Sequence, residues 1–421
     1  MIRRIQALNF RCLQHVDVAP DHFLVAVGSN ASGKSALFDV LAFLGDVVRD
    51  GLEPAVRRRT ANFQDLVWGR PQRGLRFELA IECDIPEEAR TKIPENRGFD
   101  RFRYEIAVEE QDGTLRIANE RGLLQPAGNA PIGGRRTLFP SPLPPADSIL
   151  RGGGRHGVRT ILSKSEDGRT GFYSETAPKA GKGWNVAFAL GPGRSALGSL
   201  PEIPESFPVA THVRTLLADG VKSLFLASAK MRKASPPHLG AQGFRPDGGN
   251  LPWVIQRLKR DAPARYDEWI RHVRTALGDL REVLVRVRGD DRHAYILLDY
   301  DTGVRVPSWT ASDGTLRFLA LTLLPYLPSA AVYLIEEPEN GLHPHALDAV
   351  YDALWSAHGS QVLAATHSPA FLKLVDPEET LCFARNRHGA TDIVRGTEHP
   401  MLKDWQGRAD TELLFAQGVI G

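Results

Sequence analysis

The pattern of hydrophobic and polar positions predicts a strand, a loop and a helix near the N-terminus. Residues 1–10 mix apolar and basic side chains as strands do, and residues 23–27 (FLVAV) form the short apolar run that is typical of a buried strand. A loop with glycines follows at 28–33. Beyond it, apolar side chains recur at helical spacing; these are Leu37, Val40, Leu41, Leu44 and Val48.

The middle of the chain predicts strands, an irregular region and then helices. Residues 122–160 hold many Gly, Pro and Arg residues and little periodicity, so we expect a long loop or a poorly ordered insertion there. Strand-like patterns lie at 75–83, 102–108, 283–288 and 294–299. Helical patterns lie at 211–217 and 251–280.

The last third of the chain has a strong α/β pattern. A helix is predicted at about 315–325, a strand at 332–336, a helix at 345–357 and a strand at 361–365. We expect the remainder to form a short tail ending at Gly421. The chain shows no internal repeat and no heptad run long enough for a coiled-coil arm.

Composition and charge narrow the class of protein. The 421 residues suggest two or three domains, and 52 Lys+Arg against 50 Asp+Glu exclude a grossly basic DNA coat, although not a local basic patch. Cys12, Cys83 and Cys382 lie far apart, which disfavours a zinc site or a disulfide framework and fits a reducing cytoplasm. No apolar run approaches the roughly 20 residues that span a bilayer. We therefore expect a cytoplasmic protein without a membrane partner.

Residues 28–35 read GSNASGKS, which matches the phosphate-loop pattern G-x-x-x-x-G-K-[ST] in full. Glycines at both ends let the backbone turn so that its N–H groups surround phosphates, Lys34 reaches the β and γ phosphates, and Ser35 can ligate Mg²⁺. The flanking strand and helix disfavour the alternative of a chance match in a glycine-rich turn. The predicted phosphate-binding residues are Gly28, Ser29, Asn30, Ala31, Ser32, Gly33, Lys34 and Ser35.

Two carboxylates end the strand VYLIEE at 332–337, at the edge of an α/β sheet where ligands bind. Glu336 is expected to approach Mg²⁺, and Glu337 is expected to orient or deprotonate the attacking water. The alternative is a strand that simply ends in solvated glutamates. His367 follows the next predicted strand and is a candidate for contact with the γ phosphate, the alternative being a structural or solvated histidine.

Four segments together resemble the ABC-type ATPases of the RecF, SMC and OLD-like group, often labelled AAA-type ATPases. They are MIRRIQALNFRCL at the start, GSNASGKS, ASDGTLRFLAL at 311–321, and LIEEPENGLHP followed by ATHS. The resemblance covers about 1–110 and 220–370 and is weak over 120–205. It implies an α/β P-loop NTPase fold of ABC/SMC-like type, with a mixed sheet, a second antiparallel β lobe and a compact, partly helical insertion.

The same resemblance assigns further site residues. Ser312, Asp313 and Gly314 look like the signature loop, which in this family contacts the γ phosphate bound to the other subunit; the alternative is an ordinary helix N-cap. Gln64 is a candidate for the glutamine that senses Mg²⁺. Glu336 departs from the commoner aspartate, which leaves the hydrolysis rate open but not nucleotide binding.

The resemblance also divides the chain. Residues 1–120 are expected to form the N-terminal part of an ATPase lobe, 121–290 an insertion or second lobe, and 291–421 the C-terminal part of the ATPase lobe with a tail. Without heptads the insertion is expected to be compact, closer to RecF than to SMC proteins. The tail is too short for the nuclease domain of OLD-like proteins, so a nuclease would be a separate partner.

The function expected from the sequence is ATP hydrolysis with Mg²⁺ by a head-to-tail homodimer that opens on hydrolysis, in DNA repair or a related process. One rival is the ATPase of an anti-phage or toxin module with a separate effector, and another is a nucleotide-gated scaffold with little turnover. DNA binding rests on family analogy and on two arginine clusters, Arg57–Arg59 and Arg151–Arg159. The alternative for both clusters is solvated surface arginine.

Overall fold

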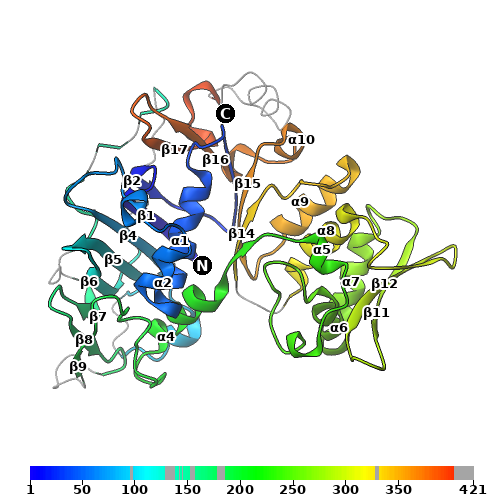
Figure 1. Ribbon diagram of the computed structural model, residues 1–421, viewed down its shortest axis with the longest axis horizontal. Coiled ribbons are helices and arrows are strands. Elements are labelled where there is room, and N and C mark those ends of the chain that lie inside the picture. The colour runs from blue at the N-terminus through cyan, green and yellow to red at the C-terminus, as the bar shows by residue number, and fades with distance from the viewer. Residues whose placement is uncertain are drawn as a thin grey trace.

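The computed structural model describes residues 1–94, 98–128, 138–141, 143–144, 146–151, 157–177, 185–327 and 331–402. Their strands form three sheets, and Figure 1 shows two lobes that meet along the central strands β14 and β15. The described helices are α1 (Lys34–Asp50), α2 (Leu52–Arg57), α3 (Glu87–Arg90), α4 (Pro208–Thr215), α5 (Ser228–Met231), α6 (Leu251–Asp261), α7 (Pro263–Val273), α8 (Asp313–Thr322), α9 (Leu347–Trp355) and α10 (Pro369–Leu372).

The central sheet has six strands in the order β10-β14-β15-β3-β16-β17. All neighbours are parallel except β16 and β17, so the sheet is mixed. Its strands are β3 (Phe23–Gly28), β10 (Val221–Leu224), β14 (Val332–Glu336), β15 (Gln361–Thr366), β16 (Thr380–Arg385) and β17 (Thr391–Arg395). The carboxyl ends of β3, β14 and β15 therefore meet at one edge, which is where the predicted site residues follow the strands.

The largest sheet is antiparallel, with the order β2-β1-β4-β5-β6-β7-β8-β9. Its strands are β1 (Ile2–Phe10), β2 (Leu13–Val18), β4 (Arg76–Asp84), β5 (Arg101–Gln111), β6 (Thr114–Gln125), β7 (Arg159–Lys164), β8 (Arg169–Tyr173) and β9 (Asn185–Ala189). A third, three-stranded antiparallel sheet joins β11 (Leu280–Val287), β12 (Ala294–Tyr300) and β13 (Arg305–Pro307). The mixed sheet and the antiparallel β lobe confirm the predicted fold class.

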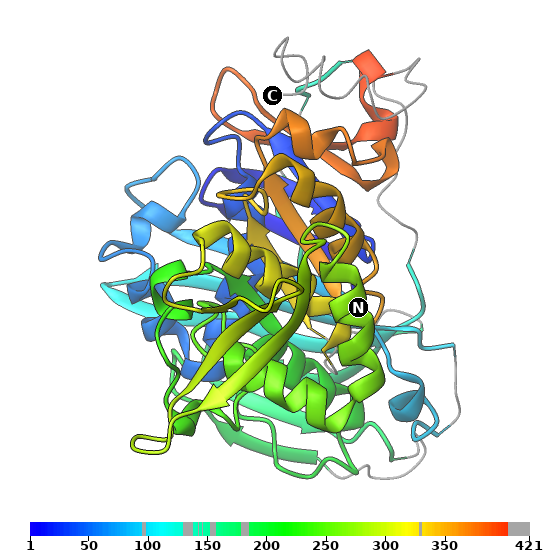
Figure 2. The same cartoon turned by 90° about the vertical axis from the view of Figure 1, so that its right-hand side faces the viewer.

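Successive side chains of β3 point to opposite faces of the central sheet and pack into two different cores. Leu24 and Ala26 join the core cluster that contains α1 and the inner face of the antiparallel sheet, including Phe77. Phe23, Val25 and Val27 join the cluster formed with α6 to α9 on the opposite face. Because successive strand residues point to opposite faces, one short apolar strand supports both cores. Figure 1 accordingly shows α1 between the two large sheets, and Figure 2 shows the third sheet and its helices in the other lobe.

Most predicted elements in the well-patterned parts are confirmed, with boundaries shifted by a few residues. The segment predicted as one helix at 251–280 is two helices, because Pro263 begins α7 at a position where proline is tolerated. At 280 the chain has already entered β11. The helix predicted at 211–217 corresponds to α4, which starts earlier and ends in a wider turn at 216–220.

Two expectations about irregular segments need correction. The region after His367 is more than a tail, because β16 and β17 complete the central sheet; residues 403–421 lie outside the described part of the chain. The predicted loop at 122–160 begins inside β6 and ends inside β7, and the described residues between them form neither helix nor strand. The expected domain boundary at residue 120 lies within β6, and the division into domains stays a prediction.

Within the described ranges, no helix combines the length and apolar character that a bilayer crossing requires.

Candidate active site

The phosphate loop is held by strands that the sequence did not indicate. A Cβ atom on Gly28 would lie 2.4 Å from the carbonyl oxygen of Phe383 in β16, and one on Gly33 would lie 2.4 Å from Oγ1 of Thr391 in β17. Gly33 also has a φ of 115°, in the left-handed region that glycine tolerates best. Thr391 Oγ1 donates a hydrogen bond of 2.8 Å to the Ser32 carbonyl. Close packing against β16 and β17 therefore requires both glycines and fixes the loop.

Lys34 begins α1, with Gly33 as its N-cap residue. Its Nζ donates to the carbonyls of Gly28 at 2.7 Å and Ser29 at 2.9 Å, and the residue is only 7% exposed. Burial lowers the pKa of this amine to about 8, against the opposing effect of two nearby carboxylates, Glu336 and Glu337. The long helix directs its positive N-terminal end at the same space as the lysine, which is a suitable arrangement for an anion.

The two predicted carboxylates lie at the end of β14. Glu336 is its last residue, and both Glu336 and Glu337 are exposed in the pocket. The Glu337 N–H donates to the Ala365 carbonyl at 2.7 Å, so the backbone stays attached to β15 while it turns. Glu337 has a φ of 49°, an unusual value for a residue with a side chain, which costs on the order of 1–3 kcal/mol. Such a conformation at a strand end is typical of functional sites.

His367 follows β15 and lines the same pocket as the two glutamates. Burial and, to a smaller extent, the charge of Lys34 lower its pKa, while Glu337 and Glu336 act in the opposite direction. A neutral imidazole at neutral pH can donate or accept a hydrogen bond beside the phosphates.

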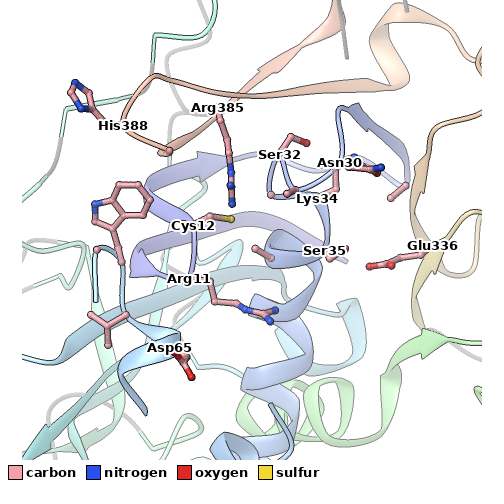
Figure 3. Close-up of a pocket in the computed structure, with 18 of the residues that line it drawn as sticks. Arg11, Cys12, Asn30, Ser32, Lys34, Ser35, Asp65, Glu336, Arg385 and His388 are labelled. Atoms are coloured by element: carbon pink, nitrogen blue, oxygen red, sulfur yellow. The ribbon is translucent and has the colours of Figure 1, made fainter. Parts of the chain in front are cut away.

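These residues surround one pocket of about 780 Å³. Figure 3 shows Asn30, Ser32, Lys34, Ser35 and Glu336 gathered at one end of it. The structure thus brings together most of the predicted phosphate loop with Glu336, Glu337 and His367. Gly28 and Ser29 do not line the pocket, and their carbonyl oxygens accept hydrogen bonds from Lys34 Nζ.

The other end of the pocket holds residues that the sequence analysis did not single out. Figure 3 shows Arg11, Cys12, Asp65, Arg385 and His388 there, and Trp68 also lines the pocket. An aromatic ring with several cations offers a stacking surface and hydrogen-bond donors. Two segments quoted for other reasons reach this end: MIRRIQALNFRCL contains Arg11 and Cys12, and the segment around Gln64 contains Asp65 and Trp68. Arg385 is the last residue of β16 and His388 lies in the loop after it, and neither has a motif beside it.

Gln64 lies beside the pocket and is not among its lining residues. Its Nε2 donates to the carbonyls of Arg70 and Pro71, both at 2.9 Å, while the next residue, Asp65, lines the pocket. The structure therefore does not place the Gln64 side chain with the predicted Mg²⁺ ligands.

The predicted signature loop also lies outside this pocket. Ser312 is the N-cap of α8 and its Oγ accepts from the Thr315 N–H at 3.0 Å, while Asp313 pairs with Arg232 at 3.0 Å. A Cβ on Gly314 would lie 2.4 Å from the Gly341 carbonyl, so this glycine is required by packing within the chain. Ser312 and Asp313 are exposed. The capping role is thus present, and the side chains remain accessible to a second molecule.

The arginine clusters are engaged in contacts within the chain. Arg57, Arg58 and Arg59 pair with Glu53, Asp50 and Asp39 respectively, each at 2.6 Å. Arg151 pairs with Glu82 at 3.1 Å, and Arg159 donates to the Ser174 and Ala177 carbonyls. These five side chains have acceptors within the chain, and Arg155 lies outside the described residues. DNA binding by these clusters stays a prediction.

A magnesium ion fits the donor set at the phosphate end. The Ser35 hydroxyl and the Glu336 carboxylate are hard oxygen donors, and Figure 3 shows Glu336 pointing toward Ser35. No cluster of three or more His, Cys, Asp or Glu side chains suited to a metal occurs in the described ranges. Mg²⁺ is usually bound by one or two protein ligands, and phosphates and water complete its coordination shell.

Comparisons with known proteins agree with this geometry. A search of curated proteins found no match. Among solved structures, the chain is similar to "Crystal structure of the SmcHead bound to the C-winged helix domain of ScpA", at 16% identity and a TM-score of 0.51, with 93% of this chain and 97% of that chain covered. That likeness supports the P-loop NTPase fold.

Another match is the "SMC head domain from Thermotoga maritima", at 11% identity and a TM-score of 0.41, covering 94% and 98% of the two chains. A family model described as "AAA domain, putative AbiEii toxin, Type IV TA system" matches residues 23–373. Because this match spans most of the chain and includes every residue gathered at the phosphate end of the pocket, the protein belongs to that AAA ATPase family.

Proposed function

We propose that this protein binds ATP with Mg²⁺ in the pocket and hydrolyses it. The observation that carries the proposal is the convergence of Lys34, Glu337 and His367 on one pocket from the ends of three parallel strands. Phosphate-binding groups, an exposed carboxylate and an imidazole in that arrangement are what phosphoryl transfer to water needs.

Each group has a separate task in this proposal. The loop amides and Lys34 bind the phosphates, and Ser35 with Glu336 holds the Mg²⁺. The bound ion supplies positive charge that offsets the developing negative charge on the phosphates. Glu337 orients and deprotonates the attacking water, and His367 contacts the γ phosphate. Trp68 and the cations at the far end of the pocket provide a surface for the nucleotide base.

The exposed position of Ser312 supports a head-to-tail dimer. In Figure 1, α8 lies in the lobe opposite α1, and its exposed N-terminus does not reach the pocket of its own chain. We propose that it contacts the γ phosphate bound to a second copy, so that two chains enclose two nucleotides.

Phosphate release from ATP by the purified chain tests the function directly. We expect turnover that needs Mg²⁺ and is abolished by Lys34→Ala, which should also lower ATP affinity by about tenfold to a hundredfold because a charged hydrogen bond to the phosphates is lost. ATP binding without any phosphate release by the wild-type chain would instead support the nucleotide-gated scaffold. Absence of ATP binding would contradict the proposal.

Two biological processes are considered for the proposed ATPase, a defence or toxin module and DNA repair. The description of the matched family names a putative toxin and a toxin–antitoxin system, and this favours the ATPase of a defence or toxin module with a separate effector. The alternative, DNA repair, predicts DNA binding that weakens steeply with salt as phosphate contacts release counterions. A gel-shift series from low to physiological salt, with and without ATP, distinguishes the two: no binding at low salt removes the repair function.

A further inference from the structure

Two loops carry the proposed catalytic groups, and one hydrogen bond between side chains joins them. Glu337 begins the loop that follows β14, and His367 lies in the turn that follows β15. Glu339, in the first loop, accepts a hydrogen bond of 2.6 Å from Oγ1 of Thr366, in the strand end that leads into the second. Thr366 has no exposed surface.

The Thr366 hydroxyl is oriented from both sides. It donates to Glu339 Oε1 and accepts from the Ser368 N–H at 2.9 Å, so the contact fixes the backbone on each side of His367. The first loop is closed by the Asn340 N–H, which donates to the Glu337 carbonyl at 3.0 Å. The Glu339 carboxylate therefore connects a turn that includes the strained Glu337 to a turn that includes His367.

The Glu339 carboxylate is partly buried and lies outside the pocket. Glu339 Oε2 has almost no exposed surface, and burying a carboxylate is unfavourable unless its contacts compensate for the lost hydration. Glu339 does not line the pocket, so we expect it to act on bound nucleotide through the residues that it contacts. A costly buried group that contacts a functional turn and not the ligand is the signature of a positioning residue.

We propose that Glu339 is a positioning residue that, through Thr366, sets the separation between the Glu337 carboxylate and the His367 imidazole. The inference rests on the proposed function of those two residues. Its consequence is that Glu339 affects the chemical step and not the binding of ATP, because the phosphate loop and Lys34 are held by other contacts.

Four variants test the hydrogen bond between Thr366 and Glu339. Glu339→Ala and Thr366→Val each remove this hydrogen bond, whereas Glu339→Gln retains an acceptor and Thr366→Ser retains a hydroxyl. Glu379→Ala is the matched control, because Glu379 is also half-buried and accepts from Tyr351 at 2.8 Å and Trp355 at 2.7 Å, away from the pocket.

We expect Glu339→Ala and Thr366→Val to lower kcat by about tenfold to a hundredfold, since small misplacements of reacting groups have effects of that size. The Kd for ATP should stay within about threefold of the wild-type value, and the double variant should be no worse than either single variant. Glu339→Gln, Thr366→Ser and Glu379→Ala should keep most of the wild-type kcat. Wild-type kcat in Glu339→Ala, or losses that add in the double variant, would overturn the proposal.

A spectroscopic measurement separates this inference from the proposed function. With labelled histidine, the His367 resonance can be assigned among the 13 histidines by its loss in His367→Asn. We expect that resonance to shift in Glu339→Ala and to return in Glu339→Gln, whether or not the chain hydrolyses ATP. An unchanged His367 resonance in a folded Glu339→Ala protein would overturn the positioning role even if ATPase activity were established.

Discussion

At the scale of single residues, the motif residues depend on partners that lie far away in the sequence. The phosphate loop at 28–35 is recognisable by itself, yet the close approach of Thr391 to Gly33 explains why its backbone holds one shape. A side chain some 360 positions away therefore supports the proposed phosphate-binding loop without lining the pocket.

Thr391→Val tests this support. The substitution keeps the shape of the side chain and removes the hydrogen bond to the Ser32 carbonyl, which is worth about 0.5–1.5 kcal/mol. We expect ATP to bind about two- to tenfold more weakly, as measured by titration with a fluorescent ATP analogue, and Thr391→Ser to restore most of the affinity. Equal affinity in the valine variant would mean that the loop keeps its shape without β17.

At the scale of elements, the sequence predicted those strands and helices that have strong periodicity and lie beside a motif. β3, α1, β14 and β15 could be predicted because they are apolar, regularly spaced and next to Gly28–Ser35 or Glu336–Glu337. β16 and β17 could not, since short strands such as TLCFAR and TDIVR gain their stability from pairing with β3 and with each other. The end of the pocket lined by Trp68, Arg385 and His388 was missed for a similar reason, because tertiary contacts and not a motif bring these segments together.

The attachment of α4 to the antiparallel sheet gives a pH-dependent stability. Glu175 is buried and accepts from the N–H groups of Val209 and Ala210, at 2.7 and 2.8 Å, in the first turn of this helix. Burial raises the pKa of its carboxyl to about 7, more than these amides and the charge of Arg159 lower it. Between pH 4.5 and about 7, the folded state therefore holds a proton that the unfolded chain, with its ordinary pKa of 4.5, has released.

Protonated Glu175 contributes to the free energy of unfolding. This contribution is fully present below pH 4.5 and is lost as the pH rises through about 7, by about 3 kcal/mol at most. Denaturant unfolding at several pH values should show this loss as a difference between the wild-type chain and Glu175→Gln, which does not titrate. Parallel pH profiles for the two proteins would show that the carboxyl does not change its proton affinity on folding.

At the scale of the whole molecule, the proposed dimer depends on the exposed N-terminus of α8. Gly314 is unsuitable for testing it, because any side chain there would collide with the Gly341 backbone in the same chain. Ser312 is better, since it is an exposed N-cap residue and both Asp and Asn are good replacements in that role.

Ser312→Asp should keep α8 folded but place a negative charge against the partner's γ phosphate, whereas Ser312→Asn changes the shape similarly without the charge. Light scattering with ATP should therefore find monomers for the aspartate variant and dimers for the asparagine variant, with ATP binding by the single chain intact in both. ATP-dependent dimers of Ser312→Asp would contradict the head-to-tail arrangement.

The central claim is that this pocket hydrolyses ATP with Glu337 acting on the water. Its most direct test is phosphate release by wild type and Glu337→Gln at saturating ATP and Mg²⁺, with bound nucleotide quantified in the same samples. The amide keeps the shape and hydrogen-bonding reach of the side chain but cannot accept the proton, so we expect ATP to be bound, retained and hydrolysed at least about a hundredfold more slowly. A Glu337→Gln protein that releases phosphate at the wild-type rate would contradict the account.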